Sequence, residues 1–304
     1  MSQELMELSD ALAKTTERVG GSTVAVHTEA RGSSTGVVWR PGVIVTSEHA
    51  LRRDEEIQVT LPDGRVLAAE LAGRDASTDL AVLKCGEARA AATEPGEASA
   101  LKPGNLTLVV GRTRASGAVA ALGVVSLVTA ERRTWTGAAL SPYIRLDVEL
   151  QPTAVGGAVV DARGRVVGLA TTKFARFGAV AIPAATVNAV VDALLSKGRI
   201  PRGYLGVGLQ PVRLPEALRQ TLERKEKTAA IVLDVGENGP AYQAGLVIGD
   251  ILVSIGGRQI THFEDVQAQL GGDAIGKSVA VKYIRGGEVR EGSLVVGERP
   301  HGEA

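Results

Sequence analysis

Apolar and polar residues follow one another with a spacing that changes twice along the chain. Over residues 1–20 the apolar residues recur at near-helical intervals, with Glu and Lys at the positions between them, and Gly20-Gly21 ends the run. The apolar residues of this stretch are Leu5, Leu8, Leu12 and Val19. The pattern predicts an amphipathic N-terminal helix that packs on the body of the protein.

Residues 21–198 consist of short apolar runs separated by turn residues. The runs IQVTL and RVLAAELAG flank Pro62-Asp63-Gly64, which has the composition of a β-hairpin turn. No helical pattern interrupts the runs until Pro183, where the apolar stripe of a helix begins; Gly198 ends it. The absence of strand–helix alternation predicts an antiparallel, mainly β body, built as a sandwich or a pair of barrels.

A second unit follows a linker at residues 199–203. Residues 204–298 mix strand-like runs with two helical patches, around PEALRQTL and FEDVQAQLGG, which is typical of a separate α+β domain. Residues 299–304 form a polar tail. We therefore expect a β domain over residues 21–198 and an α+β domain over residues 204–298.

Composition narrows the classes of function. The 34 basic and 34 acidic residues cancel, so no overall basic field attracts nucleic acid or an anionic membrane. No apolar run reaches the length of about 18 residues that a membrane span needs. The first residues, MSQELMELSDALAKTTERVGG, lack the features of a signal peptide. We expect a cytoplasmic protein, or an extracytoplasmic one if an export segment is missing from the sequence.

Neither a metal nor a cofactor is predicted. His27, His262 and His301 do not cluster with Cys or acidic residues at the spacing of metal ligands. No glycine-rich loop follows a strand and opens a helix, as a nucleotide site would require. The only cysteine is Cys85, so the chain cannot form an intrachain disulfide bond.

Two groups able to do chemistry stand at the ends of predicted strands. His49 ends the run VIVTSEHAL, and Asp79 precedes LAVLK. A glycine pair follows in QPTAVGGAVV, residues 151–160. A His oriented by an Asp, near a tight turn whose backbone N–H groups hold an oxyanion, is the arrangement used in acyl transfer. Taken alone, each residue is more typical of a structural role, so the interpretation depends on the combination.

The surroundings of these residues resemble the HtrA (Deg-type) serine proteases. TLPDGRVLAAELAGRDASTDLAVLK is similar to the segment that carries the triad Asp in that family. TSEHAL stands for the family's T-N-N-H-V-V-like strand end, and QPTAVGGAV stands for its N-P-G-N-S-G-G-P-L. The resemblance covers about residues 20–300, and it implies a chymotrypsin-like double β-barrel followed by a PDZ domain. It implies triad positions at His49, Asp79 and Val155.

The departure from the family lies at the nucleophile. Val155 stands where the family has Ser, and valine cannot form an acyl-enzyme. The oxyanion-hole region, Thr153, Ala154 and Val155, is changed as well, because Thr153 replaces a Gly. Thr153, Ser141 and Cys85 carry hydroxyl or thiol groups, but none of them occupies the nucleophile position. The sequence thus predicts a natural loss of catalysis, with a working serine endopeptidase in protein quality control as the alternative.

The second unit resembles the PDZ domain of HtrA proteases through GDILVSIGGRQITHFEDVQAQL and the upstream YLGV. The resemblance implies a carboxylate-binding loop, to which Arg202 would add charge attraction, and an apolar pocket on the FEDVQAQL helix. The loop residues are Tyr204, Leu205, Gly206 and Val207, and the pocket residues are Val266 and Leu270.

The predicted function is that of a non-catalytic HtrA-type protein. Its partners would be unfolded polypeptide or peptide C-termini, bound in a chaperone-like or regulatory role. A further hypothesis is a subunit that joins copies of itself or active HtrA relatives. HtrA proteins usually form trimers through aromatic residues near the N-terminus, and this chain has none before Trp39, so the sequence does not predict that contact.

Overall fold

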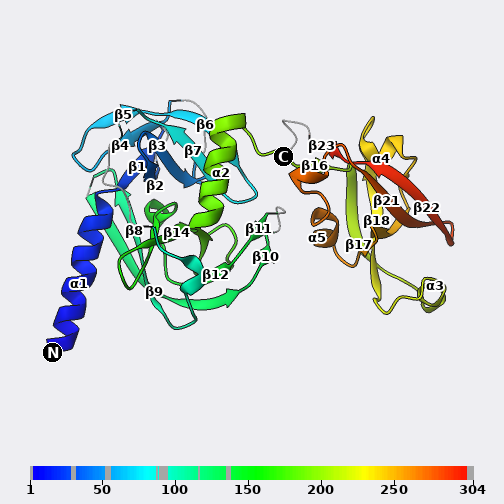
Figure 1. The fold of residues 1–304 in the computed structure, drawn as a ribbon, viewed down its shortest axis with the longest axis horizontal. Coiled ribbons are helices and arrows are strands. Elements are labelled where there is room, and N and C mark those ends of the chain that lie inside the picture. The colour runs from blue at the N-terminus through cyan, green and yellow to red at the C-terminus, as the bar shows by residue number, and fades with distance from the viewer. Residues whose placement is uncertain are drawn as a thin grey trace. The chain divides into compact units, whose positions relative to one another are not determined.

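The computed structural model describes residues 3–28, 32–51, 56–86, 88, 95–115, 117–134 and 138–299. The chain divides into two compact units, Met1–Ile200 and Pro201–Ala304 (Figure 1). In the described part of both units, more residues lie in strands than in helices, so the predicted mainly β fold class is confirmed. None of the helices in the described ranges combines the length and the apolar content needed to cross a membrane.

The first sheet of the first unit has seven antiparallel strands in the order β5-β4-β1-β2-β3-β7-β6. The strands are β1 (Thr23–His27), β2 (Ser33–Arg40), β3 (Val43–Ser47), β4 (Gln58–Thr60), β5 (Val66–Ala68), β6 (Glu70–Asp75) and β7 (Leu80–Lys84). The hairpin predicted around Pro62-Asp63-Gly64 joins β4 to β5, where Thr60 pairs with Val66. His49 follows the end of β3, and Asp79 directly precedes β7, which is the neighbour of β3.

The second sheet closes into a barrel in the order β12-β15-β14-β13-β8-β9. Its strands are β8 (Leu106–Thr113), β9 (Gly117–Thr129), β12 (Tyr143–Asp147), β13 (Ala158–Asp161), β14 (Val166–Thr171) and β15 (Ala179–Pro183). Short segments complete the unit: β10 (Arg132–Arg133), β11 (Ala139–Leu140), and the 3₁₀ turns η1 (Ala98–Ala100) and η2 (Pro152–Ala154). The 3₁₀ turn η2 immediately precedes Val155.

One apolar core joins the two sheets and positions the site between them. Val45 and Val82 of the first sheet and Leu169 of the barrel are all buried in the same cluster. Helix α2 (Ala184–Lys197) adds Val187 and Leu194 to this cluster. It ends at Gly198, whose φ of 69° is the left-handed conformation that glycine adopts easily at a helix C-terminus.

The N-terminal helix differs from the sequence expectation in how it packs. Helix α1 (Gln3–Gly20) reaches the body only with its C-terminal part, where Val19 is buried and Leu12 packs on the core. Leu5 and Leu8 are 54% and 42% exposed. Figure 1 shows the N-terminal end of α1 extending beyond β8 and β9, so the first turn has no sheet to pack on, whereas Leu8 lines a hollow with Leu106 and Leu122.

The second unit is built on a sheet in the order β17-β18-β19-β21-β22, with β20 paired to β19. These strands are β17 (Val207–Arg213), β18 (Thr228–Val235), β19 (Ile251–Ile255), β20 (Arg258–Gln259), β21 (Ser278–Arg285) and β22 (Glu288–Val295). A two-stranded ladder joins β16 (Gly203–Tyr204) to β23 (Gly297–Glu298). Strand β17 stands at the edge of the larger sheet, because it pairs only with β18.

The helices of this unit depart from the prediction in two places. The predicted patch around PEALRQTL is α3 (Glu216–Thr221), but α4 (Pro240–Gln243) was not expected, and a 3₁₀ turn, η3 (Gly272–Ala274), precedes β21. Helix α5 (Phe263–Gln267) ends before Leu270, so Leu270 does not lie on the helix where the sequence placed it. Its N–H instead closes a turn onto the carbonyl of Gln267.

Candidate functional site

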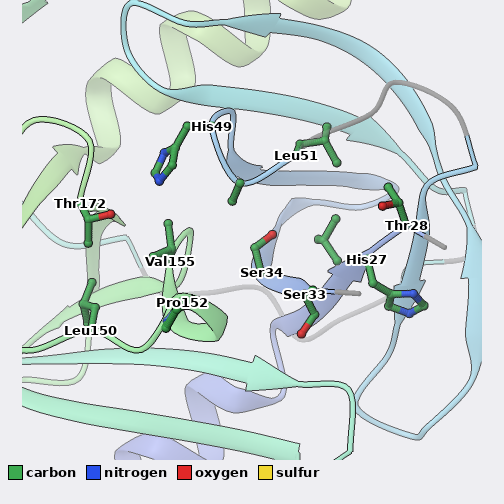
Figure 2. Close-up of a pocket in the computed structure, with 13 residues that line it drawn as sticks. His27, Thr28, Ser33, Ser34, His49, Leu51, Leu150, Pro152, Val155 and Thr172 are labelled. Atoms are coloured by element: carbon green, nitrogen blue, oxygen red, sulfur yellow. The ribbon is translucent and has the colours of Figure 1, made fainter. Parts of the chain in front are cut away.

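A cavity of about 350 Å³ in the first unit brings together residues from both sheets (Figure 2). His49 and Ser34 line it from the first sheet, and Leu150 and Val155 line it from the segment before β13. In Figure 2 the imidazole of His49 and the side chain of Val155 face the same side of this cavity. On this side of the cavity, the apolar side chain of Val155 therefore lies next to the imidazole of His49.

The histidine and the aspartate predicted from the sequence are in direct contact. The Nδ1 atom of His49 lies 2.9 Å from Oδ1 and 2.8 Å from Oδ2 of Asp79, and the backbone N–H of His49 also donates to Oδ1 at 2.9 Å. An ionised carboxylate only accepts, so Nδ1 is the donor. In the neutral ring Nε2 then carries no proton and is free to accept one. The arrangement is that of a general base held by a carboxylate.

Two hydroxyl groups that sequence reasoning missed complete the surroundings of Asp79. Ser47 donates to Oδ2 at 2.6 Å, and Thr171, at the end of β14, donates to the same oxygen. Burial alone would raise the pKa of Asp79, but the hydrogen bonds from His49, Ser47 and Thr171 outweigh burial and hold its pKa below the ordinary value. The carboxylate is therefore ionised at neutral pH, although its side chain is fully buried.

An ion-pair network lies beside this pair and crosses between the sheets. The Nζ atom of Lys173 lies 3.0 Å from Glu48 and 3.9 Å from Oδ1 of Asp79, and it donates to the carbonyl of Ala76 at 3.0 Å. Arg74 lies 3.4 Å from the other oxygen of Glu48. Because Lys173 follows β14 and Glu48 follows β3, the network ties the two halves of the unit together next to His49.

In the loop that leads to Val155, backbone N–H groups donate to carbonyls of the loop itself and not into the cavity. The N–H of Val155 donates to the carbonyl of Pro152 at 3.3 Å, and the N–H of Ala154 donates to Gln151 at 2.9 Å. An oxyanion hole requires such N–H groups to point at the position of the reacting oxygen. In the observed 3₁₀ turn η2 they are already used within the loop.

Hydrogen bonds from Thr35, which is distant in the sequence, fix the shape of this loop. The hydroxyl of Thr35 donates to the carbonyl of Thr153 at 2.6 Å, and the N–H of Thr35 donates to the carbonyl of Val155 at 2.9 Å. Gly156 has a φ of 81°, and a Cβ atom there would lie 2.3 Å from the carbonyl oxygen of Thr35. The turn therefore requires glycine for both conformation and space.

No alternative nucleophile lies close to His49 among the three residues considered from the sequence. The Oγ1 atom of Thr153 is buried and has no hydrogen-bond partner in the described part of the chain. Ser141 donates its hydroxyl to the carbonyl of Ala130 at 2.9 Å. Cys85 is buried in the apolar core of the first sheet. The structure does not bring their side chains to the cavity that His49 lines.

In the second unit, the predicted carboxylate-binding loop lies between β16 and β17. Gly206 has a φ of 75°, which favours glycine. The ring of Tyr204 lies beside it, and its Cε1 atom would be 3.3 Å from a Cβ atom placed at Gly206. The carbonyls of Leu205 and Gly206 accept hydrogen bonds from Ala241 and Gly236. In the described residues the N–H groups of Leu205 and Gly206 donate to no partner. Two neighbouring N–H groups are thus available to a ligand.

The apolar residues predicted to line the peptide pocket meet in one cluster. Val266 is 2% exposed, and it belongs to the same cluster as the buried Leu205. Val207 and Leu270 are partly buried against this cluster. Although Leu270 lies beyond α5, its carbonyl accepts a hydrogen bond from Gly203 at 3.0 Å, which keeps it beside the loop.

The histidine and acidic side chains of the described ranges are not gathered as metal ligands are. No group of three or more His, Cys, Asp or Glu side chains in these ranges is arranged to hold a metal ion. His27 lines the cavity together with His49, but Figure 2 places them at opposite ends, and Nε2 of His27 is 3.0 Å from the hydroxyl of Thr60.

Comparison with protein families matches both units. Residues 34–169 match the model of the trypsin-like peptidase domain, and residues 203–296 match the model of the PDZ domain. The predicted fold, a trypsin-like β domain followed by a PDZ domain, is therefore confirmed. The trypsin-like match ends beyond the loop of Val155 and includes both His49 and Asp79.

Curated relatives carry the same combination. A probable periplasmic serine endoprotease DegP-like from Halomonas elongata is 31% identical over 281 residues, which is 90% of this chain and 58% of that protein. Proteins with the same description from Bartonella henselae and Pseudomonas putida are 32% and 31% identical and cover 86% and 91% of this chain. The chain spans between 52% and 58% of the length of these relatives.

Solved structures agree over nearly the whole chain. The HtrA-type protease AlgW with a tripeptide is 26% identical with a TM-score of 0.74, covering 95% of this chain and 97% of that one. The serine endoprotease from Yersinia pestis is 25% identical with a TM-score of 0.74. AlgW with a decapeptide has a TM-score of 0.75 at 24% identity, which shows the shared fold.

These comparisons correct one expectation. The sequence led us to expect a cytoplasmic protein, whereas the curated relatives are named as periplasmic. The expectation of a cytoplasmic location is therefore wrong. It rested on the absence of a signal-peptide pattern at the start of the sequence, and where a sequence begins does not fix where the protein works.

Proposed function

The chain belongs to the HtrA/DegP-type trypsin-like peptidases with a PDZ domain, and from this premise we propose that it binds polypeptide without cleaving it. The cavity beside His49 holds an extended segment of unfolded polypeptide, and the PDZ domain holds the C-terminus of a peptide. The protein then acts as a chaperone-like or regulatory relative of the endoproteases.

The observation that carries this proposal is the structure of the loop at Val155, the position where the family has its nucleophile. At Val155 a branched apolar side chain, 5% exposed, stands beside His49 where a hydroxyl would be needed. The N–H of the same residue is bonded to Pro152 rather than directed into the cavity. Both parts of acyl transfer, attack and oxyanion stabilisation, are missing at one position.

The PDZ part of the proposal rests on an open backbone site. The free N–H groups of Leu205 and Gly206 stand next to the edge strand β17, beside a partly buried apolar cluster. A peptide strand can add to such an edge, with its terminal carboxylate on the N–H groups and its last side chain on Val266. The proteins of similar fold whose descriptions name a bound decapeptide or tripeptide support peptide binding in this fold.

A working serine endopeptidase is the second candidate. The relatives are named as serine endoproteases, and the contact between His49 and Asp79 retains the base that such an enzyme needs. This candidate requires a nucleophile at Nε2 of His49. Val155 supplies none, and the hydroxyl of Thr153 is buried away from any partner.

Cleavage of an unfolded protein substrate decides between the two. The chain is compared with its His49→Ala variant, and we expect no cleavage by either, together with saturable binding of the substrate by both. Cleavage that disappears in His49→Ala would identify a live enzyme and overturn the proposal. If no unfolded polypeptide binds, the proposed role of the cavity beside His49 is wrong, and only the proposed binding of peptide C-termini by the PDZ domain remains.

The names of the relatives also support a proposal about location. Since the curated relatives are described as periplasmic, we propose that this chain works outside the cytoplasm as well. Fractionation of its native cells, followed by detection with an antibody against the chain, tests this: recovery with the cytoplasmic fraction would contradict it.

A further inference from the structure

A second cavity of the first unit, of about 470 Å³, has a different chemistry from the one at His49. Three arginines from three separate segments line it: Arg132 on β10, Arg145 on β12 and Arg176 in the loop after β14. Asp147 is the one carboxylate among the described residues that line it. Three positive charges thus face one negative charge in a chain whose formal net charge is zero.

Neutral neighbours hold the guanidinium groups in place. The guanidinium carbon of Arg132 lies 5.0 Å from the ring centre of Tyr143, and that of Arg176 lies 5.6 Å from the ring centre of Phe177. The Nε of Arg145 donates to the hydroxyl of Ser126 at 3.1 Å. These contacts orient the groups without neutralising them.

Among the residues that the structure describes, the three arginines have no acidic partner. No ion pair among the described residues joins Arg132, Arg145 or Arg176 to a carboxylate, whereas other arginines of the first unit, such as Arg40 and Arg165, pair with aspartates. Positioned and uncompensated guanidinium groups around a hollow are suited to carboxylate recognition, because the planar fork matches a carboxylate.

The apolar part of the cavity points to a polypeptide rather than to a small anion. The chain has only three phenylalanines, and two of them, Phe174 and Phe177, line this cavity. Phe177 is 80% exposed, the highest value among the large apolar side chains in the described residues, so its ring is accessible to a ligand. A ligand that covers both features carries carboxylates and apolar side chains together.

We propose that the cavity formed by Arg132, Arg145, Arg176 and Phe177 binds an acidic segment of polypeptide that also carries apolar side chains. The site is separate from the cavity at His49, yet the two share one loop. Thr172 lines the cavity at His49, and the residues from Phe174 to Phe177 line the arginine cavity. The proposal does not depend on whether the chain cleaves its ligand.

Fluorescence anisotropy with a defined peptide tests the proposal on the full chain. The probe alternates Asp or Glu with Leu or Phe, and it is acetylated and amidated so that it offers no terminal carboxylate to Leu205 and Gly206. We expect the triple variant R132Q/R145Q/R176Q to bind it about tenfold more weakly, the combined effect of three exposed charge pairs. Salt should weaken binding to the unchanged chain more than binding to the variant.

A matched triple variant controls for net charge. K102Q/R163Q/R258Q removes the same three charges from exposed positions outside the cavity, and it should bind the peptide like the unchanged chain. A peptide with Asn and Gln in place of Asp and Glu should bind weakly to all three proteins. Circular dichroism confirms that both variants fold.

Three results would overturn the proposal. They are unchanged affinity in R132Q/R145Q/R176Q, equal loss in the control variant, and equal binding of the neutral peptide. Displacement of the peptide by millimolar inorganic phosphate, with the same dependence on the three arginines, would replace the polypeptide by a free anion and overturn the choice of partner.

Discussion

Two loops of this protein, one in each unit, are built on the same backbone device and are in opposite states. The loop before Val155 and the loop at Leu205 and Gly206 each combine neighbouring N–H groups with a glycine at positive φ, 81° at Gly156 and 75° at Gly206. In the first loop the N–H groups bond to carbonyls of the same loop, and in the second they have no partner among the described residues.

The difference shows what makes a backbone anion site. Glycine at positive φ is present in both loops, so it does not decide the outcome. The decisive factor is the competing acceptor: the carbonyl of Pro152 lies within reach of the N–H of Val155, whereas the carbonyls of Leu205 and Gly206 are turned away and accept from Ala241 and Gly236. An N–H group satisfied by its own loop gains little from a ligand.

Reopening the first loop should give the largest change. Val155→Ser alone restores a hydroxyl beside His49 but leaves the turn that occupies the N–H groups, so we expect activity on an unfolded substrate to stay near background. The double change V155S/T153G should exceed V155S by about 10²–10³, the usual value of oxyanion-hole donors.

Casein cleavage rates measure this prediction, and V155S/T153G/H49A serves as the control that must be inactive. Equal activity of V155S and V155S/T153G, well above background, would mean that the 3₁₀ turn opens on its own when substrate binds. The two loops would then differ only in the absence of substrate.

The two glycines should differ strongly in what an added methyl group costs. A Cβ atom at Gly156 would lie 2.3 Å from the carbonyl of Thr35, whereas at Gly206 the nearest heavy atoms lie at 3.3 Å. We expect Gly156→Ala to lower the free energy of unfolding of the first unit by about 3 kcal/mol. Gly206→Ala should cost the second unit about 1 kcal/mol.

Urea unfolding separates the two effects. Both tryptophans of the sequence precede residue 200, so their fluorescence reports on the first unit, and far-UV circular dichroism follows both. Similar losses in the two variants would contradict this expectation, because a Cβ atom at Gly156 would lie 2.3 Å from a backbone atom, whereas one at Gly206 would lie 3.3 Å from its nearest backbone atom.

The open loop should depend on a terminal carboxylate. Amidating the C-terminus of a peptide that binds the PDZ domain removes a charged acceptor from the N–H groups of Leu205 and Gly206. We expect its affinity to fall by roughly 1.5–3 kcal/mol, the range for hydrogen bonds to charged groups. Calorimetry with the free and the amidated peptide measures this, and equal affinities would show that the N–H groups are not the anchor.

Acid should weaken the first unit through Asp79. Because its pKa is lowered in the folded state, the ionised carboxylate contributes stability above its unfolded value, near 3.9, and this contribution is lost as the pH falls through the folded value. The free energy of unfolding should therefore decrease below about pH 4. Asp79→Asn should remove this dependence, measured by urea titrations between pH 3 and 7.

The exposed Asp63 provides the matched control for the pH experiment. Its pKa is also lowered, first by the backbone N–H and then by the side chain of Arg65, but it lies at the surface. Asp63→Asn should change the acid dependence less than Asp79→Asn does. An equal change would indicate that the buried pair with His49 has no special weight.

The sequence predicted those features that depend on local pattern. The hairpin at Pro62-Asp63-Gly64 and the end of α2 at Gly198 follow from turn and cap residues. The helix beyond Gln267 did not form, because the apolar spacing up to Leu270 is compatible with a turn as well. The local pattern also did not show how much of α1 packs on the protein. Leu5 has the spacing of a packed residue, but it is exposed.

The sequence alone determined where the apolar runs that form strands lie along the chain. It also determined that position 155 has no hydroxyl and that the two loops contain the glycines they require. Only the tertiary structure decided which groups meet. Thr171 reaches Asp79 from 92 positions away, Thr35 holds Thr153 from 118 positions away, and three arginines from separate segments line one cavity. The reason is physical: hydrogen bonds and charges act over a few ångströms, and only the packing of the two sheets brings such distant segments that close.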